Sequence, residues 1–291
     1  MKKLVAEMGK AVLRLLPDKQ YLEAKYRYIF GKHLDLENPQ SYSEKLQWLK
    51  LYDRDSRYSA MVDKIAVKPL VEQLIGSEHI IKTIAYWDKP EDIEWDKLPN
   101  KFVLKTAHGG GMEGVLICRD KSTFDIGRAI KKLNKAYSQD LYKVNREWPY
   151  KMVPKRILAE EYMEDEFGEL RDYKFFCFDG VVRALFVATE RTKREEPFFN
   201  FFDENYKPLP MKQGHPVAPK IPLKPKCFDE MKEIAGVLSK GYPHVRVDLY
   251  EINGKVYFGE YTFYHFGGMV PFEPEEWDYK FGCWLQLPNK N

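Results

Sequence analysis

The sequence predicts an α+β fold built from antiparallel hairpins and helices. Short β-type runs separated by tight turns lie at 172–178 with 181–188, and again across 245–262. A turn this short joins antiparallel strands. Segments 123–138 and 228–240 instead carry apolar residues at helical spacing. Together the hairpins and helices indicate the α+β class.

The composition is that of a globular protein with little net charge. The 291 residues are 44% hydrophobic, and 47 Lys and Arg stand against 44 Asp and Glu, a net charge of +3. This balance is too mild to favour nucleic-acid binding. No apolar run approaches the roughly 18 residues of a membrane span. The four cysteines are scattered without a C-x-x-C pair, so we expect neither zinc knuckle nor disulfide framework, and a reducing cytoplasm fits.

Residues 1–75 carry helical patterns, and the first of them is amphipathic. Charged residues interrupt its apolar positions, so a signal peptide is not expected. Such a helix either packs on its own protein or rests on an anionic membrane surface. We therefore expect a cytoplasmic protein, with contact to the inner membrane face as the alternative that this helix leaves open. Its apolar residues are Leu4, Val5, Met8, Val12, Leu15 and Leu16.

The run 245–262 predicts a hairpin whose register decides whether charged side chains meet. Alternation places Arg246 and Asp248 on one side of the first strand. A three-residue loop at 252–254, a common hairpin closure, sets Arg246 opposite Glu260. A two-residue Asn-Gly turn would slip the pairing by one residue and move Glu260 to the other side.

In the first register Asp248, Glu260 and Thr262 share one face beside Arg246. Hard oxygen ligands next to a fixed cation suit Mg²⁺ held against phosphates. The alternative is a hairpin whose charges are simply solvated on its outer face. The register of this hairpin is therefore the first prediction that the structure has to test.

A glycine-rich loop follows the predicted strand 102–105. Residues 108–114 match G-x-G-x-x-G by letters, but a dinucleotide fingerprint requires a helix directly after the loop. Here 115–118 is β-type, and no Walker-type motif is present. We therefore predict a hairpin flap entered by Lys105. Backbone N–H groups of such a flap can approach phosphates closely, although a flexible tip without a ligand is the alternative.

In this order, a lysine before a glycine flap, an acidic segment, an R-x-D triplet and a C-terminal glutamate resemble ATP-grasp carboxylate–amine ligases. The chain resembles most closely the TupA-like branch, linked to teichuronopeptide and other polysaccharide biosynthesis. The resemblance covers about residues 20–285 and rests on four stretches: 38–45, 105–111, 172–176 and 246–248.

The resemblance implies an ATP-grasp fold in which ATP lies between two antiparallel-sheet lobes. It further implies three parts. Residues 1–95 would form a mostly helical N-terminal region. Residues 96–163 would form the lid subdomain with its glycine flap, and residues 164–291 the large catalytic subdomain.

The resemblance also implies which residues hold ATP. Lys105 would contact the α- and β-phosphates, with Lys68 as a second lysine and Lys64 as the less favoured choice. The glycine flap would close over the triphosphate. The hinge at 160–163 would meet the adenine, and Asp172 the ribose hydroxyls. The implied nucleotide site comprises Lys68, Lys105, His108, Gly109, Gly110, Gly111, Glu160, Glu161, Tyr162, Met163 and Asp172.

For the chemistry, the resemblance implies that Arg246 and Lys105 stabilise the transferred phosphate. Asp248 and Glu260 match the metal carboxylates, which would bind one or two Mg²⁺ ions. The family usually has Asn two residues after the metal glutamate, where this chain has Thr262. A hydroxyl is a weaker ligand than an amide carbonyl, so the number of ions stays open.

Four further residues are candidates for the acceptor. Arg191 and Arg194 could hold the charge of an acidic sugar, unless this basic run is only solvated. His265 lies beside the metal strand. Gly267 falls where ligases of this group often place a glycine turn near the acceptor. The polar, proline-containing segment 190–225 is predicted to be a long loop over the site.

The implied activity is ATP- and Mg²⁺-dependent amide formation through an acyl phosphate. The substrates would be a small-molecule or glycan carboxylate, such as a uronic acid of a capsular or cell-surface polysaccharide, and an amino acid or amine. The alternatives are a glycosyltransferase, a kinase or a non-catalytic nucleotide-binding protein. A glycosyltransferase often carries D-x-D after a strand, whereas residues 53–55 match it inside a helical region. The sequence names neither the acid nor the amine, nor the oligomeric state.

Overall fold

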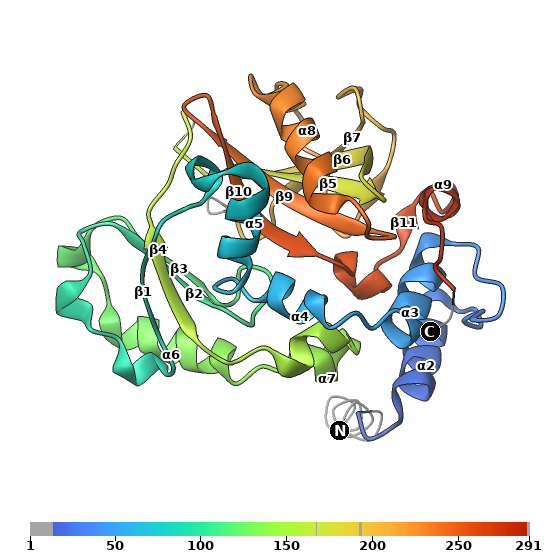
Figure 1. Ribbon diagram of the computed structural model, residues 1–291, viewed down its shortest axis with the longest axis horizontal. Helices are drawn as coiled ribbons and strands as arrows, with labels where there is room; N and C mark the ends of the chain where they lie inside the picture. The colour runs from blue at the N-terminus through green and yellow to red at the C-terminus, as the bar shows by residue number, and fades with distance from the viewer. Residues whose placement is uncertain (1–13, 167, 192–193, 290–291) are drawn as a thin grey trace.

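The structure, a computed structural model, describes residues 14–166, 168–191 and 194–289. Two antiparallel sheets form its two halves (Figure 1). One has four strands in the order β1-β4-β2-β3, and the other has five in the order β10-β9-β5-β6-β7. The predicted α+β class with two antiparallel lobes is confirmed.

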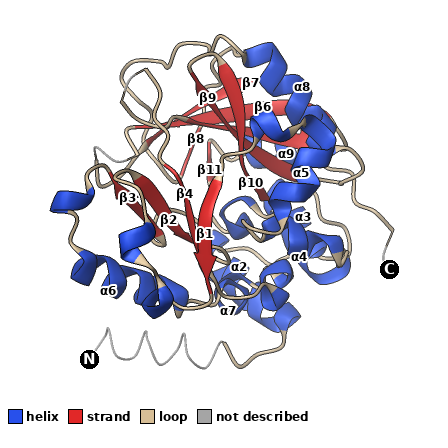
Figure 2. Cartoon of the chain, turned by 60° about the vertical axis from the view of Figure 1, so that its left-hand side comes forward, coloured by secondary structure: helices blue, strands red, loops and turns tan. Residues whose placement is uncertain are grey.

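Most helices lie around the outside of the sheets (Figure 2). In the described chain they are α2 (Asp18–Phe30), α3 (Tyr42–Tyr52), α4 (Arg57–Val62), α5 (Val67–Ile75), α6 (Ile126–Tyr137), α7 (Leu141–Asn145), α8 (Phe228–Ser239) and α9 (Glu276–Trp284). The strands are β1 (Thr83–Trp87), β2 (Phe102–Thr106), β3 (Val115–Cys118), β4 (Ile157–Glu161), β5 (Asp172–Phe178), β6 (Val181–Thr189), β7 (Phe198–Asp203), β8 (Lys212–Gln213), β9 (Val245–Ile252), β10 (Lys255–Thr262) and β11 (Phe272–Glu273).

The N-terminal helices begin and end where local chemistry dictates. Ser41 caps α3 because its hydroxyl accepts from the Glu44 N–H, and Glu44 returns a bond to the Ser41 N–H. Gly31 ends α2 in the left-handed conformation. The predicted amphipathic helix falls mainly on residues 1–13, which lie outside the described residues. Across the described residues, no helix combines the length and apolarity needed to cross a bilayer.

The four-stranded sheet packs on α6. Leu133 and Ala129 of this helix are buried, and Leu133 joins a cluster with Phe102 and Leu104 of β2. β1 pairs with β4, so this sheet begins at residue 83 and includes residues ahead of the proposed lid boundary at 96. The three-part division of the chain stays a prediction, with β1 tied by hydrogen bonds to the lid.

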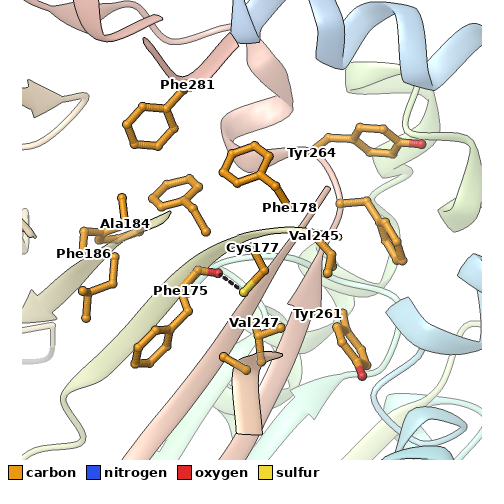
Figure 3. Close-up of a cluster of buried hydrophobic side chains, with 14 of the residues drawn as sticks. Phe175, Cys177, Phe178, Ala184, Phe186, Val245, Val247, Tyr261, Tyr264 and Phe281 are labelled. Carbon is orange, nitrogen blue, oxygen red and sulfur yellow. Dashed lines mark hydrogen bonds between the residues drawn. The ribbon is translucent and has the colours of Figure 1, made fainter. Parts of the chain in front are cut away.

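The five-stranded sheet carries the main core. Every residue of β5 is buried, and α8 packs on β5, β6 and β9. Phe175, Val247 and Tyr261 lie on the face of this sheet that α8 covers, whereas Phe281 of α9 packs against Phe176 on the opposite face (Figure 3). Because both faces of β5 and β9 are covered, the charged residues among them are held in fixed positions.

The hairpin β9–β10 reaches the expected face by an unexpected route. Its turn has two residues, Asn253 and Gly254, with φ of 53° and 74°, so the predicted three-residue loop is wrong. A β-bulge at Gly259 then shifts the register, and Glu260 pairs opposite Asp248. The bulge adds a second one-residue shift to that of the short turn, so Glu260 returns to the expected face but lies opposite Asp248, and the predicted pairing of Glu260 with Arg246 is wrong.

The segment 190–225 is not one long loop. Phe198–Asp203 forms β7, which pairs with β6 along six residue pairs, and Lys212–Gln213 pairs with β11. Its four phenylalanines at 198, 199, 201 and 202 are buried, which gives the segment a reason to join the sheet. The charged and proline residues around this aromatic run conceal it in the sequence.

Candidate functional site

A cavity of about 560 Å³ is lined by both sheets. The four-stranded sheet contributes residues such as Val103 and Lys105, and the five-stranded sheet contributes Lys174, Arg246 and Glu260. Large concave sites between two lobes are the usual places for small-molecule ligands. Most of the residues singled out from the sequence line this cavity or lie directly behind its wall.

On the four-stranded sheet, one carboxylate holds two lysines. Glu160 of β4 pairs with Lys105 Nζ at 2.5 Å and with Lys68 Nζ at 2.6 Å. Burial opposes ionisation of Glu160, but Lys105 and Lys68 together lower its pKa below the usual value. Lys68 also donates to the Ile81 carbonyl and the Thr83 hydroxyl, and it does not line the main cavity.

Lys64, the less favoured lysine of the sequence, lines the cavity instead. Its Nζ donates to the Gly109 carbonyl at 2.6 Å and lies 3.2 Å from Glu260 Oε2. Lys64 therefore connects the glycine flap with the metal-type hairpin. The pattern around 63–68 offered both lysines, and only the packing of this segment on β4 distinguishes them.

The glycine flap joins β2 to β3 as predicted. Gly110 and Gly111 line the cavity. Gly109 does not, because it packs so closely on β2 that a Cβ there would come within 2.1 Å of the Thr106 hydroxyl. His108 is buried away from the cavity, where its Nε2 donates to the Tyr137 carbonyl. Burial lowers its pKa to about 4, so the ring is neutral.

The hinge after β4 lines an apolar part of the cavity. Glu161, Tyr162 and Met163 contribute to it, and the Tyr162 hydroxyl accepts from Arg119 Nε at 3.0 Å. The neighbouring lining side chains are apolar: Ile81, Val103, Val115, Ile117 and Leu170. An apolar part of a cavity suits a nucleobase.

On the five-stranded sheet, Asp248 is completely buried and holds two cations. Arg246 makes a bidentate contact, with Nε and Nη2 each 2.7 Å from an Asp248 oxygen. Lys174 of β5 hydrogen-bonds to the same carboxylate and pairs with Asp172 at 2.6 Å. Sequence reasoning missed Lys174, although alternation along β5 places it on the face of Asp172.

The structure places Arg191 beside Asp172 and Arg194 away from both. Asp172 is buried behind the cavity wall and pairs with Arg191 at 3.1 Å. Burial disfavours the Arg191 charge, but Asp172 raises its pKa overall. Arg191 lines the cavity, whereas Arg194 does not and lies over the Phe198 ring.

Glu260 and Thr262 project beside Arg246. Burial opposes the charge of Glu260, but Lys64 and the neighbouring cations lower its pKa well below the usual range. The Thr262 hydroxyl accepts from Arg246 Nη2 at 2.9 Å. The described residues contain no cluster of three or more His, Cys, Asp or Glu side chains arranged for a metal ion.

His265 lies behind Arg246 rather than in the cavity. It is fully buried, accepts from Arg246 Nη1 at 2.6 Å and donates to Gln213 Oε1. Burial and the charge of Arg246 hold its pKa well below the ordinary value, which keeps it neutral. Gly267 does line the cavity, in a turn where Phe266, Gly267 and Gly268 all have positive φ.

The sequence matches one family model, described as TupA-like ATPgrasp, over residues 44–286. No curated protein matches it. The matching solved structures are similar at low identity, a level at which the likeness concerns the fold alone.

Three solved structures illustrate this likeness. D-alanine–D-alanine ligase from Bacillus anthracis is 18% identical with a TM-score of 0.40, over 69% of this chain and 56% of that one. The corresponding Helicobacter pylori ligase is 15% identical with a TM-score of 0.43, over 86% and 70%. The ATP-grasp ligase PsnB, complexed with minimal precursor, Mg and ADP, is 13% identical with a TM-score of 0.40, over 76% and 57%. The chain thus spans little more than half the length of the first and the third.

Proposed function

Because the chain belongs to the TupA-like ATP-grasp family, whose model matches residues 44–286, we propose that it is an ATP- and Mg²⁺-dependent carboxylate–amine ligase. It joins the two substrates through an acyl phosphate and releases ADP and phosphate. The observation that carries this proposal is the cavity where Lys64 and Lys105 face Arg246 and Glu260. Cations from separate segments converge there, as the triphosphate of ATP requires.

The residues beside Arg246 fit a magnesium ion. Glu260 pairs directly opposite Asp248, so two carboxylates project from adjacent strands on one face. Mg²⁺ is commonly held by one or two carboxylates together with substrate phosphates and water. Asp248 and Glu260 would hold the ion, with the Thr262 hydroxyl alongside, after Lys174 or Arg246 yields part of its contact with Asp248. The ion would neutralise phosphate charge.

The chain's own cations then lower the barrier to the first step. Bringing a carboxylate to a triphosphate sets like charges close together, and each unit pair at 4 Å costs about 4 kcal/mol at an effective dielectric of 20. Lys64, Lys105 and Arg246 offset that repulsion from fixed positions, which requires little reorganisation. Gly110 and Gly111 cover the reacting groups and exclude water, which would otherwise hydrolyse the acyl phosphate.

For the substrates, we propose a uronic acid of a capsular or cell-surface polysaccharide as the carboxylate and an amino acid or amine as the partner. The TupA-like family supports this class. Arg191 lines the cavity and can hold a second negative charge of an acidic glycan, whereas the outward position of Arg194 leaves it the weaker candidate. We place the reaction in the cytoplasm, where ATP is available.

The test is release of ADP and phosphate with a panel of uronates and amino acids, with the products identified by mass spectrometry. A ligase gives stoichiometric ADP, free phosphate and an amide. A kinase would give ADP and a phosphorylated acceptor, and a non-catalytic protein would bind ATP without either product. A phosphorylated acceptor without amide would therefore refute the ligase proposal.

A further inference from the structure

Glu147 is a buried carboxylate of the cavity that forms no ion pair within 4 Å with any described residue. Glu147 lies just after α7 and lines the cavity while only 8% exposed. Its Oε1 accepts from Asn145 Nδ2 at 2.9 Å, and within the described chain no donor reaches its Oε2. By contrast, Glu160 and Glu260 in the same cavity are both paired with lysines. Burying a carboxylate without a partner costs free energy, and a ligand that binds in the cavity and pairs with it would offset that cost.

The cations nearest to Glu147 direct their hydrogen bonds elsewhere. Lys50 of α3 donates to the Gly267 carbonyl at 2.6 Å and to Gln47 Oε1. Lys25 of α2 donates to Asn145 Oδ1 at 2.7 Å. Their charges, with that of Arg246 on β9, act on Glu147 from a distance, while burial has the larger effect and raises its pKa.

Glu147 also lies beside the predicted acceptor turn. A Cβ placed on Gly267 would come within 3.3 Å of Glu147 Oε1, so carboxylate and turn are in contact. Tyr150 and Tyr264 line the same part of the cavity, and burial raises the pKa of both hydroxyls. Both phenols therefore remain neutral and leave the carboxylate as the acidic group that faces Gly267.

We propose that Glu147 binds the ammonium group of the amine substrate and accepts one of its protons. This rests on the proposed ligase function and deepens it by assigning the amine site. An ammonium ion would be repelled by Lys64, Lys105 and Arg246, so it needs a carboxylate that these cations do not already neutralise. A base must also lie within hydrogen-bond reach of the attacking nitrogen, and a carboxylate with a raised pKa is a stronger base than an ordinary one.

The proton and electron balance is complete with the substrates named. One proton of R–NH₃⁺ passes to Glu147, and the nitrogen lone pair of R–NH₂ attacks the acyl carbon. The C–N bond forms and the C–O bond to phosphate breaks. A second proton leaves the nitrogen with the departing phosphate as HPO₄²⁻, and Glu147 later returns its proton to water.

The first experiment compares two nucleophiles in Glu147→Gln, with glucuronate, galacturonate and ATP present. Glycine arrives as an ammonium and needs a base, whereas hydroxylamine is largely uncharged at neutral pH. We expect kcat/KM for glycine to fall at least about 100-fold. Hydroxamate formation should change by less than about threefold. Glu233→Gln, on the exposed side of α8, is the matched control and should change neither rate. Equal losses with both nucleophiles would overturn the proposal.

The second experiment does not depend on turnover. In the complex with ADP and Mg²⁺, the Glu147 carboxyl resonance is followed by ¹³C NMR and assigned by its loss in Glu147→Gln. Methylammonium should lower the pKa of Glu147, because a bound cation favours the ionised form, while methanol of similar size should not. No response to methylammonium rejects the amine site. A wild-type protein that makes no hydroxamate from any uronate, yet responds to methylammonium, would instead count against the proposed substrates.

Discussion

At the four-stranded sheet, the carboxylate of Glu160 stands against two ammonium groups, those of Lys105 on β2 and Lys68 on the adjoining helix α5. On the five-stranded sheet and just after β6, three carboxylates stand against three cations: Asp172, Asp248 and Glu260 with Lys174, Arg191 and Arg246. Lys64 reaches Glu260 from outside this sheet. Among these residues, the cavity wall at the four-stranded sheet therefore carries a surplus positive charge. The cavity wall at the five-stranded sheet has equal numbers of positive and negative groups and is called the balanced wall. A polyanion is attracted by the first wall unaided, whereas the second becomes attractive once a divalent ion joins it. This difference agrees with the proposal that the triphosphate lies against the lysines beside the four-stranded sheet and that Mg²⁺ joins the five-stranded sheet.

Asp248→Asn removes the central charge of the balanced wall and should have the largest effect. Arg246 and Lys174 would remain buried without their main partner, which costs about 3 kcal/mol. Turnover should fall about 10³-fold because the proposed Mg²⁺ ligand is lost as well. Urea unfolding and phosphate release measure the two effects. Asp229→Asn, whose carboxylate is 93% exposed, is the control and should change neither. Wild-type turnover in Asp248→Asn would contradict the metal assignment.

Two lysine variants then test which ammonium faces the nucleotide. Lys64→Ala removes a cation that lines the cavity, so we expect KM for ATP to rise about 10- to 100-fold. Lys68→Ala removes a lysine held behind Glu160, so KM should change less and the free energy of unfolding should fall instead. Steady-state kinetics and thermal unfolding of both variants decide between them. The opposite ranking would restore Lys68 as the phosphate ligand.

Gly259→Ala tests the bulge that aligns the balanced wall. A Cβ at this position would lie 3.0 Å from the Asp248 carbonyl and from the Tyr250 ring, so the strand must shift. We expect a loss of about 1–3 kcal/mol in stability and a fall in kcat. Gly127→Ala in α6, where a Cβ meets only ordinary contact at 3.5 Å, should be neutral or slightly stabilising. Unchanged kcat in Gly259→Ala would show that the bulge does not set the catalytic register.

The sequence predicted those features that depend on local periodicity. Alternation and helical spacing located β5, β6 and α8 to within one residue and α6 to within three, because buried faces impose these periods. The turn at Asn253 and the bulge at Gly259 each shift the register of β10 by one residue. Their combined effect depends on how Gly259 fits against Tyr250, which no local pattern contains.

The sequence identified which charged residues belong to the site better than it predicted which of their side chains face the cavity. Lys64 and Lys68 lie four positions apart, and which one faces the cavity depends on where β4 presents Glu160. Lys174 and Glu147 were missed because a lysine inside a strand and a glutamate in a loop are usually solvated. Only tertiary packing shows that both are buried.

Acid should destabilise both halves of the molecule, each through one buried histidine. Burial lowers the pKa of His108, beside the four-stranded sheet, to about 4, and that of His244, at the start of β9, to about 3. Between pH 6.5 and 4, both histidines are protonated in the unfolded chain but stay neutral in the folded chain. Stability contributed by these neutral rings is therefore present above pH 6.5 and is lost as the pH falls.

His108→Gln should reduce this loss without abolishing it. Its side-chain amide can still donate to the Tyr137 carbonyl, so stability at pH 7 should change little. The fall in unfolding free energy between pH 6.5 and 5 should become shallower, since only His244 of the pair then contributes. Urea titrations at half-unit pH steps measure the slope. A variant with the wild-type slope would mean that His108 is protonated in the folded protein, and that the lid around it is more open to water than its burial indicates.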